Sequence, residues 1–239
     1  KGGLKFKSRF DEFQDFSEKY LNESLEKSLK NLNTNYIDIY LLHSPNLDAI
    51  NDNVFKTLEK FKQNNLISEF GVSVKNPSDA KFFIQKYGVK IIETNFSLID
   101  QRVKEYGVFD NFKGVKIISR TPLNYGFLTD NNFGKLEFNK QNDHRFRFGN
   151  EQLEIWNNAI DKFKKEFDNF KIYNKNLTRS QFSLNFCISH SQVLVAIPGM
   201  MREEEVLENA KTNNLDKFNE DLLNKLYEIY KKNIFFKKN

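Results

Sequence analysis

Apolar positions along this chain follow two different periods, one typical of helices and one typical of buried strands. Residues 16–32 carry apolar side chains at three- and four-residue intervals, with Ser17 and Glu18 suited to a cap and first turn, which predicts an amphipathic helix. Residues 36–43, YIDIYLLH, form a nearly continuous β-rich apolar run. Such a run predicts a strand that is buried on both faces.

The same alternation continues to the end of the chain. Later strands are predicted at 69–74, 89–98, 115–123 and 193–198, and later helices from Val54 to Phe61 and at 78–87, 100–112, 151–170 and 179–189. Parallel strands need crossover helices, so this order predicts an α/β fold with a parallel sheet. A length of 239 residues suits one large core, and we expect a single domain over 1–239.

One long irregular segment, 128–150, interrupts the pattern. Long loops in compact domains are often binding loops, although a solvated surface excursion would have the same composition. The pattern leaves both interpretations open.

Charge, hydropathy and cysteine content exclude several classes of protein. The chain has 37 basic and 32 acidic residues, with the lysines scattered, so a basic pocket for a phosphate explains the surplus better than nucleic-acid binding. No apolar stretch approaches a membrane span and no secretion signal is present, so we expect a cytoplasmic protein without a membrane partner. The single cysteine, Cys187, excludes a disulfide within the chain and is expected to be a packed core thiol.

Small, polar or charged residues stand where the predicted strands end. They are His43 and Ser44, Ser73, Glu93 to Asn95, Arg120 to Pro122, and Gly199. In barrels of alternating strands and helices, catalytic and binding groups gather at this face. Any one of them taken alone suits a structural role, such as a helix cap or a backbone hydrogen bond. Their shared position favours a site.

Several ordered motifs resemble the aldo-keto reductases: SLEKSLKNLNTNYIDIYLLHSP, FGVSVKNP, ETNFSLIDQR, RTPLNYGFLTD, DHRFRF and IPGMMREEEVLENA. The resemblance covers nearly the whole chain. It implies a TIM-type (β/α)8 barrel that reduces aldehydes or ketones with a nicotinamide cofactor and without a metal. His43 matches the family's active-site histidine, which positions and polarises the substrate carbonyl, and Lys1, in KGG, is similar to the lysine of the catalytic tetrad.

The other two members of the tetrad, an aspartate and a tyrosine, precede this lysine in the family. A tyrosine can protonate the carbonyl oxygen when a neighbouring ammonium lowers its pKa, and Lys1 would provide that cation. The predicted strands are also too few for a closed barrel of about eight. We therefore expect that the first two to three strands, with the aspartate and tyrosine, belong to a longer protein or are supplied by another chain.

The resemblance also implies a cofactor site. Ser73 matches a serine that binds the nicotinamide amide, Glu93 stands in place of a glutamine, and Arg120 replaces a stacking aromatic residue, which a guanidinium can imitate. The segment after the fourth predicted strand would wrap the pyrophosphate; its expected cofactor-binding residues are Pro122, Leu123, Gly126 and Leu128.

The helix after the last strand would bind the adenosine end. Gly199 precedes this helix, whose N-terminus favours phosphate, and Glu208 and Asn209 match the family's adenine-binding pair. Arg202 favours the 2′-phosphate of NADP, whereas Glu205 favours the free ribose hydroxyl of NAD or is simply a first-turn acid. We expect NADP, with NAD as the alternative.

Together these features predict an NAD(P)H-dependent oxidoreductase acting on a small carbonyl compound or sugar. The alternative from another class is a catalytically inactive barrel that binds nucleotide and serves as a regulatory or scaffold subunit. A nucleic-acid binder is a third interpretation, but the sequence contains no motif for it.

Overall fold

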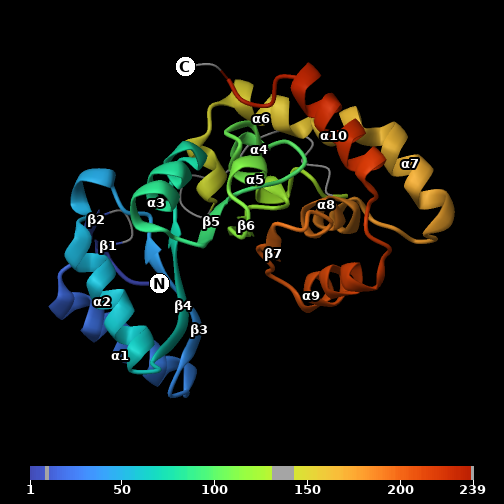
Figure 1. Ribbon diagram of the computed structural model, residues 1–239. Coiled ribbons are helices and arrows are strands. Elements are labelled where there is room, and N and C mark those ends of the chain that lie inside the picture. Colours follow the sequence, from blue (N-terminus) through green and yellow to red (C-terminus); the bar gives the residue numbers. More distant parts are fainter. Residues whose placement is uncertain (9–10, 131–142, 238–239) are drawn as a thin grey trace. The chain divides into compact units, whose positions relative to one another are not determined.

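The computed structural model describes residues 1–8, 11–130 and 143–237 (Figure 1). They form two compact units, the first made of the described residues within 1–94 and 102–118 and the second of those within 95–101 and 119–239. Five strands form one sheet in the order β3-β4-β5-β6-β7, which confirms the predicted α/β class. Among the described residues, no helix has both the length and the apolar character needed to cross a bilayer.

The strands are β1 (Leu4–Ser8), β2 (Asp11–Gln14), β3 (Ile37–His43), β4 (Ile67–Ser73), β5 (Ile91–Asn95), β6 (Lys116–Arg120) and β7 (Val193–Ile197). The helices are α1 (Glu18–Leu32), α2 (Asp52–Gln63), α3 (Ala80–Tyr87), α4 (Arg102–Glu105), α5 (Val108–Asn111), α6 (Asn150–Asn157), α7 (Lys164–Tyr173), α8 (Arg179–Ile188), α9 (Glu203–Ala210) and α10 (Glu220–Lys232).

Helix α1 forms as its sequence predicts. The Ser17 hydroxyl accepts the N–H of Tyr20 at the N-terminus, and Asn33 ends the helix in the left-handed conformation. The apolar stripe buries Leu21 and Leu25. In the first unit α1 and α2 pack against one another, and α2 also packs on β4 (Figure 1).

Strand β3 is only partly buried, which corrects the expectation of burial on both faces. Its first residues, Ile37 and Ile39, are half-buried and Asp38 is exposed, because β3 is an outer strand of the five-stranded sheet. Tyr40 to Leu42 are buried, where Gly2 pairs with Leu42 in parallel, and the last residue, His43, is half-buried.

A hairpin that the sequence analysis did not predict follows Gly3. Strands β1 and β2 pair antiparallel, and the amide of Gln14 fixes the hairpin to the turn after β3. Nε2 of Gln14 donates to the backbone carbonyl oxygen of Ser44 at 2.9 Å, and Oε1 of Gln14 accepts the backbone N–H of Asn46 at 2.9 Å. The alternating letters LKFK at residues 4–7 were a signal for this strand.

The predicted helix at 100–112 is two short helices, α4 and α5. Gly107 separates them with φ +69°, a left-handed conformation that favours glycine. A Cβ at this position would lie 2.5 Å from Nδ2 of the exposed Asn111 side chain, which can move aside, so the break depends on glycine for its backbone angle.

The second unit has its core around α8. Thr178 and Gln181 form a capping box at its start, and most of the helix is buried. Cys187 is fully buried on it, as expected of a core thiol, and burial raises its pKa to about 12.

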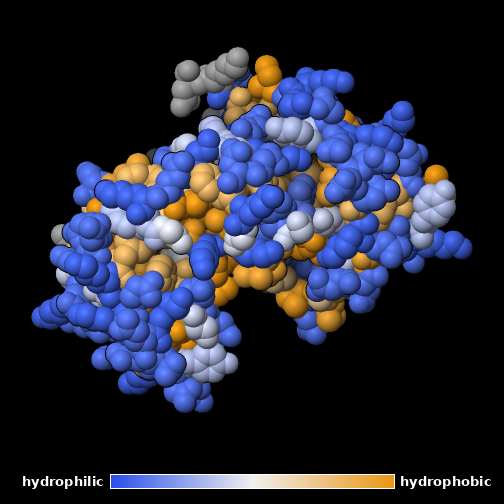
Figure 2. Space-filling view, in the orientation of Figure 1, coloured by the Kyte–Doolittle hydropathy of each residue, from blue (hydrophilic) through white to orange (hydrophobic). Residues whose placement is uncertain are grey.

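Strand β7 is the other outer strand of the sheet. It exposes Leu194, Val195 and Ile197 by 40 to 49%. Apolar surface around β7 and α9 is visible in Figure 2. An outer strand has a neighbour in the sheet on one side only.

Candidate active site and cofactor cavity

In the first unit, the ends of four extended segments meet in register. The backbone oxygen of Gly2 accepts the N–H of His43 at 2.8 Å, which sets the chain start beside the end of β3. His43 pairs with Ser73 on β4, and Ser73 pairs with Glu93 on β5. The structure thus brings Lys1, His43, Ser73 and Glu93 to one end of the parallel strands, where the resemblance places catalytic chemistry.

Glu93 connects two of these residues. Its side chain is almost fully buried, and Oε1 accepts both the ammonium of Lys1 and the hydroxyl of Ser73, the latter at 3.0 Å. The Lys1 side chain is 32% exposed. A buried carboxylate needs such partners, because losing its water shell without them is costly.

The second unit contains a cavity of about 560 Å³. It is lined by the end of β6, the loop after it, residues 144 and 145, the start of α8, the end of β7 and α9. Most of the predicted cofactor residues line it: Arg120, Pro122, Leu123, Gly126, Gly199, Arg202, Glu205, Glu208 and Asn209. Leu128 is fully buried beneath its loop instead, and its carbonyl accepts the Ser183 hydroxyl at 3.0 Å.

The loop after β6 is shaped by unusual backbone angles. Arg120 donates from Nε to Asn95 Oδ1 at 2.9 Å, so its guanidinium has a fixed direction at the cavity wall. Thr121, Asn124 and Tyr125 then all have positive φ values, a conformation that is uncommon for residues other than glycine. Such local strain is often found at binding sites, where the surrounding structure maintains it.

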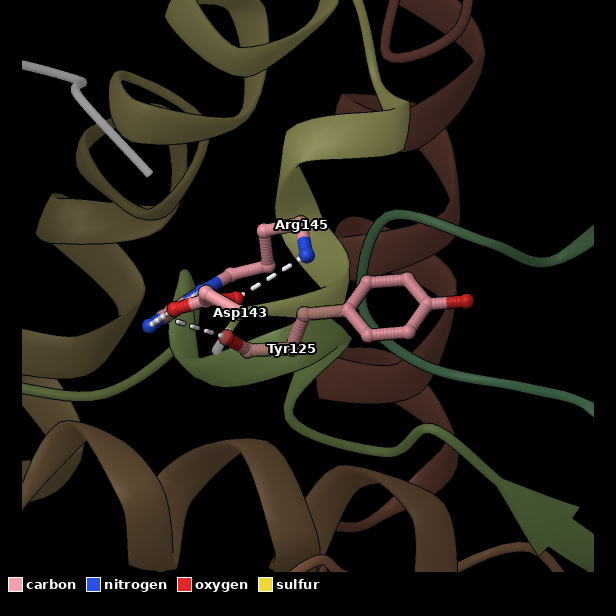
Figure 3. A network of polar contacts seen from close by, with 3 residues as sticks. All are labelled: Tyr125, Asp143 and Arg145. Carbon is pink, nitrogen blue, oxygen red and sulfur yellow. Dashed lines mark hydrogen bonds and ion pairs between the residues drawn. The ribbon is translucent and has the colours of Figure 1, made fainter. Parts of the chain in front are cut away.

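Arg145 holds this loop and was not predicted as a site residue. Its Nε donates to both carboxylate oxygens of Asp143, at 2.9 and 3.0 Å. Its Nη1 donates to the backbone carbonyl oxygen of Tyr125 at 3.2 Å (Figure 3). The guanidinium keeps the pKa of Asp143 below its usual value. The motif DHRFRF, with two arginines between aromatic residues, was the available signal. Of the long loop predicted at 128–150, residues 131–142 lie outside the described residues.

The Tyr125 ring points away from Arg145 (Figure 3) and contacts other aromatic side chains. Its centroid lies 5.3 Å from that of His144, 5.0 Å from Phe148 and 5.8 Å from Trp156. The pKa of His144 is lowered mainly by burial and also by Arg147. His144 therefore adds a largely neutral ring to the cavity near pH 7.

At the start of α9, the role of Glu205 is visible in its contacts. The carboxylate accepts the N–H groups of Met201 at 2.7 Å and Arg202 at 3.3 Å, which caps the helix. It also binds the Arg202 guanidinium at 2.9 Å, and these hydrogen bonds lower its pKa. Glu208 accepts the Thr178 hydroxyl at 2.6 Å. Glu205 thus serves as a first-turn acid, one of the interpretations left open by the sequence.

The chemistry of the cavity lining suits a dinucleotide. Arg120 and Arg202 place guanidinium groups, which suit phosphate oxygens, at the cavity wall. Tyr125 adds an aromatic surface. These groups match the phosphates and rings of a nicotinamide dinucleotide.

Comparisons with known proteins agree with this geometry. The sequence profile described as "Aldo/keto reductase family" matches residues 5–231. The chain belongs to the aldo/keto reductase family. Members of this family are oxidoreductases that use nicotinamide cofactors on carbonyl compounds.

Two curated oxidoreductases are similar to this chain at low identity. The "Uncharacterized oxidoreductase YqkF" of Bacillus subtilis is 24% identical over 223 residues, covering 93% of this chain and 70% of the relative. The "L-glyceraldehyde 3-phosphate reductase" of Escherichia coli O157:H7 is 24% identical over 220 residues, covering 86% of this chain and 62% of the relative. The chain thus spans between 62 and 70% of the length of these two proteins.

Solved structures confirm the fold. The aldo-keto reductase AKR11C1 from Bacillus halodurans, in its holo form, matches with a TM-score of 0.72 and 20% identity over 95% of this chain and 70% of its own. The glycerol dehydrogenase AKR11B4 from Gluconobacter oxydans matches with a TM-score of 0.73 and 18% identity over 99% of this chain and 72% of its own. This chain therefore has the fold of the family's barrels.

Proposed function

We propose that this protein reduces an aldehyde or ketone of a small molecule or sugar by hydride transfer from NAD(P)H. The observation that carries the proposal is the cavity of the second unit. It gathers Arg120, the loop after β6 and the N-terminus of α9, which the resemblance assigns to the cofactor, around one volume of about 560 Å³.

His43 and Lys1 are the proposed catalytic residues. A bound nicotinamide cofactor would supply the hydride for the carbonyl carbon, and negative charge would then develop on the carbonyl oxygen. His43 would donate a hydrogen bond to that oxygen, and the Lys1 ammonium would lower the pKa of the tyrosine that protonates it. In the first unit the backbone hydrogen bond between Gly2 and His43 keeps the two residues at neighbouring strand ends.

The proposed cofactor is NADP, with NAD as the alternative. The Arg202 side chain is 66% exposed at the start of α9, within reach of solvent and ligand. Glu205 already accepts backbone N–H groups, so its carboxylate is committed to the helix cap. A 2′-phosphate could share the guanidinium with Glu205, since an arginine has five donors.

The names of the relatives guide the choice of substrate. One is called a glycerol dehydrogenase and another an L-glyceraldehyde 3-phosphate reductase. We therefore propose a short polyhydroxylated aldehyde or ketone as the substrate. We also propose that the enzyme has a single domain and is located in the cytoplasm. The inactive regulatory alternative has no support from the family match or the relatives.

A titration with NADPH and NADH, followed through Trp156 emission, tests the proposal. Trp156 contacts Tyr125 of the cavity wall, so its fluorescence should respond to cofactor. We expect saturable binding of NADPH and NADPH oxidation with glyceraldehyde. Absence of binding by either cofactor would contradict the proposal, and binding without turnover across a panel of carbonyl compounds would favour the inactive alternative.

A further inference from the structure

Beyond the proposed cofactor contacts, one buried carboxylate orders the catalytic end of the first unit. Glu93 lies in the middle of β5 with 1% of its surface exposed. A single oxygen, Oε1, accepts both the Lys1 ammonium and the Ser73 hydroxyl. Neither partner is a neighbour in sequence, so the strand register creates this arrangement.

We infer that Glu93 is the positioning residue that fixes the ammonium of Lys1 at the catalytic strand ends, an inference that rests on the proposed function. A charged carboxylate is buried only when opposite charge and hydrogen-bond donors compensate the loss of water. Lys1 supplies the charge and Ser73 a further donor. The ion pair with the buried carboxylate therefore holds the lysine side chain in place.

The backbone around Glu93 leaves it little freedom to move. Its carbonyl accepts the N–H of Val74 at 2.9 Å, which ties β5 to the end of β4. The lysine has a long, flexible side chain, and the loss of its rotamer freedom must be compensated. A rigid strand provides a fixed anchor, so the glutamate sets the position and the lysine follows.

The hydroxyl of Ser73 gains a defined direction from the same contact. Because it donates to Glu93, its lone pairs remain oriented as acceptors for a ligand N–H. A glutamine at position 93 could bind this hydroxyl, but it would not hold an ammonium by charge. The carboxylate at position 93 therefore adds a charged contact to Lys1 that a glutamine would lack.

The matched comparison is another lysine–glutamate pair within the first unit. Lys62 binds Glu69 of β4 with a side-chain exposure of 31%, close to the 32% of Lys1. Glu69 differs because its side chain is 36% exposed, whereas that of Glu93 is 2% exposed. The two lysines are thus similarly accessible to a reagent, and the two carboxylates differ in burial.

The experiment measures how fast acetic anhydride acetylates the Nζ atoms of Lys1 and Lys62. The folded protein is labelled without cofactor, and each site is then quantified by mass spectrometry of its peptides. Only the neutral amine reacts, so the rate reports how strongly the ammonium is held. In Glu93→Gln we expect Lys1 to react about fivefold or more faster, with Lys62 unchanged. In Glu69→Gln we expect Lys62 to react less than about twofold faster and Lys1 not to change.

Lys62 also serves as the internal control for folding in Glu93→Gln. If that variant does not fold, Glu93→Asp, which retracts the carboxylate by one methylene, should give an intermediate rise at Lys1. A Lys1 rate equal to that of the native protein in a folded Glu93 variant would overturn the inference.

Failure of the inference is distinguishable from failure of the proposed function. A rise in Lys1 acetylation in a protein that binds no nicotinamide cofactor would support the positioning role and reject the reductase. Conversely, an active reductase in which Glu93→Gln leaves the acetylation rate of Lys1 unchanged would support the proposed function and reject the positioning role. In an active enzyme, Glu93→Gln should also lower kcat more than it raises KM and shift the pH profile of kcat, whereas a merely structural loss would leave that profile unmoved.

Discussion

The carboxylate of Glu205 lies 2.9 Å from Nη2 of Arg202, within the first turn of α9. The two residues favour opposite cofactors when considered separately, since one attracts a 2′-phosphate and the other repels it. Their ion pair combines them into a nearly neutral unit at the cavity. The preference between NADPH and NADH therefore depends on how much of the Arg202 charge remains for a ligand.

Glu205→Gln should raise the affinity for NADPH by about two- to fivefold and leave that for NADH almost unchanged, because an exposed ion pair is worth little more than this. Removal of the carboxylate releases the guanidinium for the 2′-phosphate. Fluorescence titration with both cofactors measures the effect. The control is Glu204→Gln, an exposed acid of the same turn. An equal change for both cofactors would show that Arg202 does not meet the 2′-phosphate.

His43→Ala should lower kcat by about a hundredfold or more, as expected when a hydrogen-bond donor to the developing negative charge on oxygen is removed. The dissociation constant of NADPH should change little, because the imidazole acts on the substrate carbonyl. Steady-state kinetics and cofactor titration on the same sample separate the two effects. Asp38→Ala, at an exposed position of β3, is the control. Parallel losses of binding and turnover would point to a folding defect instead.

Arg145→Lys should weaken cofactor binding and lower the free energy of unfolding by about 1–2 kcal/mol, since a lysine cannot reproduce the planar fork. In the native protein the guanidinium joins Asp143 to the Tyr125 backbone, as Figure 3 shows. Denaturant unfolding and NADPH titration measure the two effects. Arg179→Lys, which alters the surface pair with Asp161, should affect neither strongly. Unchanged NADPH binding in Arg145→Lys would mean that the Tyr125 loop needs no such support.

The affinity for NAD⁺ should rise about two- to fivefold as the pH falls from neutral through the pKa of His144, because this residue then gains a positive charge at the cavity lining. Partial burial and Arg147 hold the pKa of His144 below its usual value, so the ring gains its proton only at a pH below the ordinary histidine pKa. The same lowered pKa means that the residue's contribution to stability is present above the ordinary histidine pKa and is lost as the pH falls through the folded one.

His144→Gln should remove this pH dependence. NAD⁺ is the suitable probe, since its pyrophosphate does not titrate in this range, whereas the 2′-phosphate of NADP does. A pH dependence that persists in the variant would assign it to another group.

Cys187 should not react with a thiol reagent such as DTNB in the native state at neutral pH. Burial keeps the reagent from the thiol and raises the pKa of Cys187 to about 12. The thiol also donates to the backbone carbonyl oxygen of Phe96 at 3.5 Å. Labelling should therefore follow unfolding and accelerate with denaturant in step with loss of circular dichroism. Rapid labelling of the native protein would show that the core of the second unit opens locally.

Local patterns predicted most elements because the physics behind them is local. The three- and four-residue spacing from Phe16 to Leu32 and the cap at Ser17 sufficed for α1, and the apolar runs sufficed for β3 to β7. The break at Gly107 was missed because one glycine in a helical pattern does not by itself show that it takes a left-handed angle.

The site was predictable in part for the same reason. Strand ends can be found from sequence, and parallel register then brings His43, Ser73 and Glu93 together. Arg145 was missed because its importance comes from a carbonyl twenty residues away, at Tyr125. No spacing rule connects a guanidinium to one distant backbone oxygen.

The sequence by itself determined the alternation of strands and helices, the polar strand ends and the resemblance to the family, because these follow from periodicity and from residues close together in the chain. Only the tertiary structure decided that Glu93 holds Lys1, that Glu205 caps α9 while binding Arg202, and that Arg145 supports the Tyr125 loop. A charged side chain can satisfy its need for a partner in many ways, and the choice among them depends on which groups the folded backbone brings within hydrogen-bond distance.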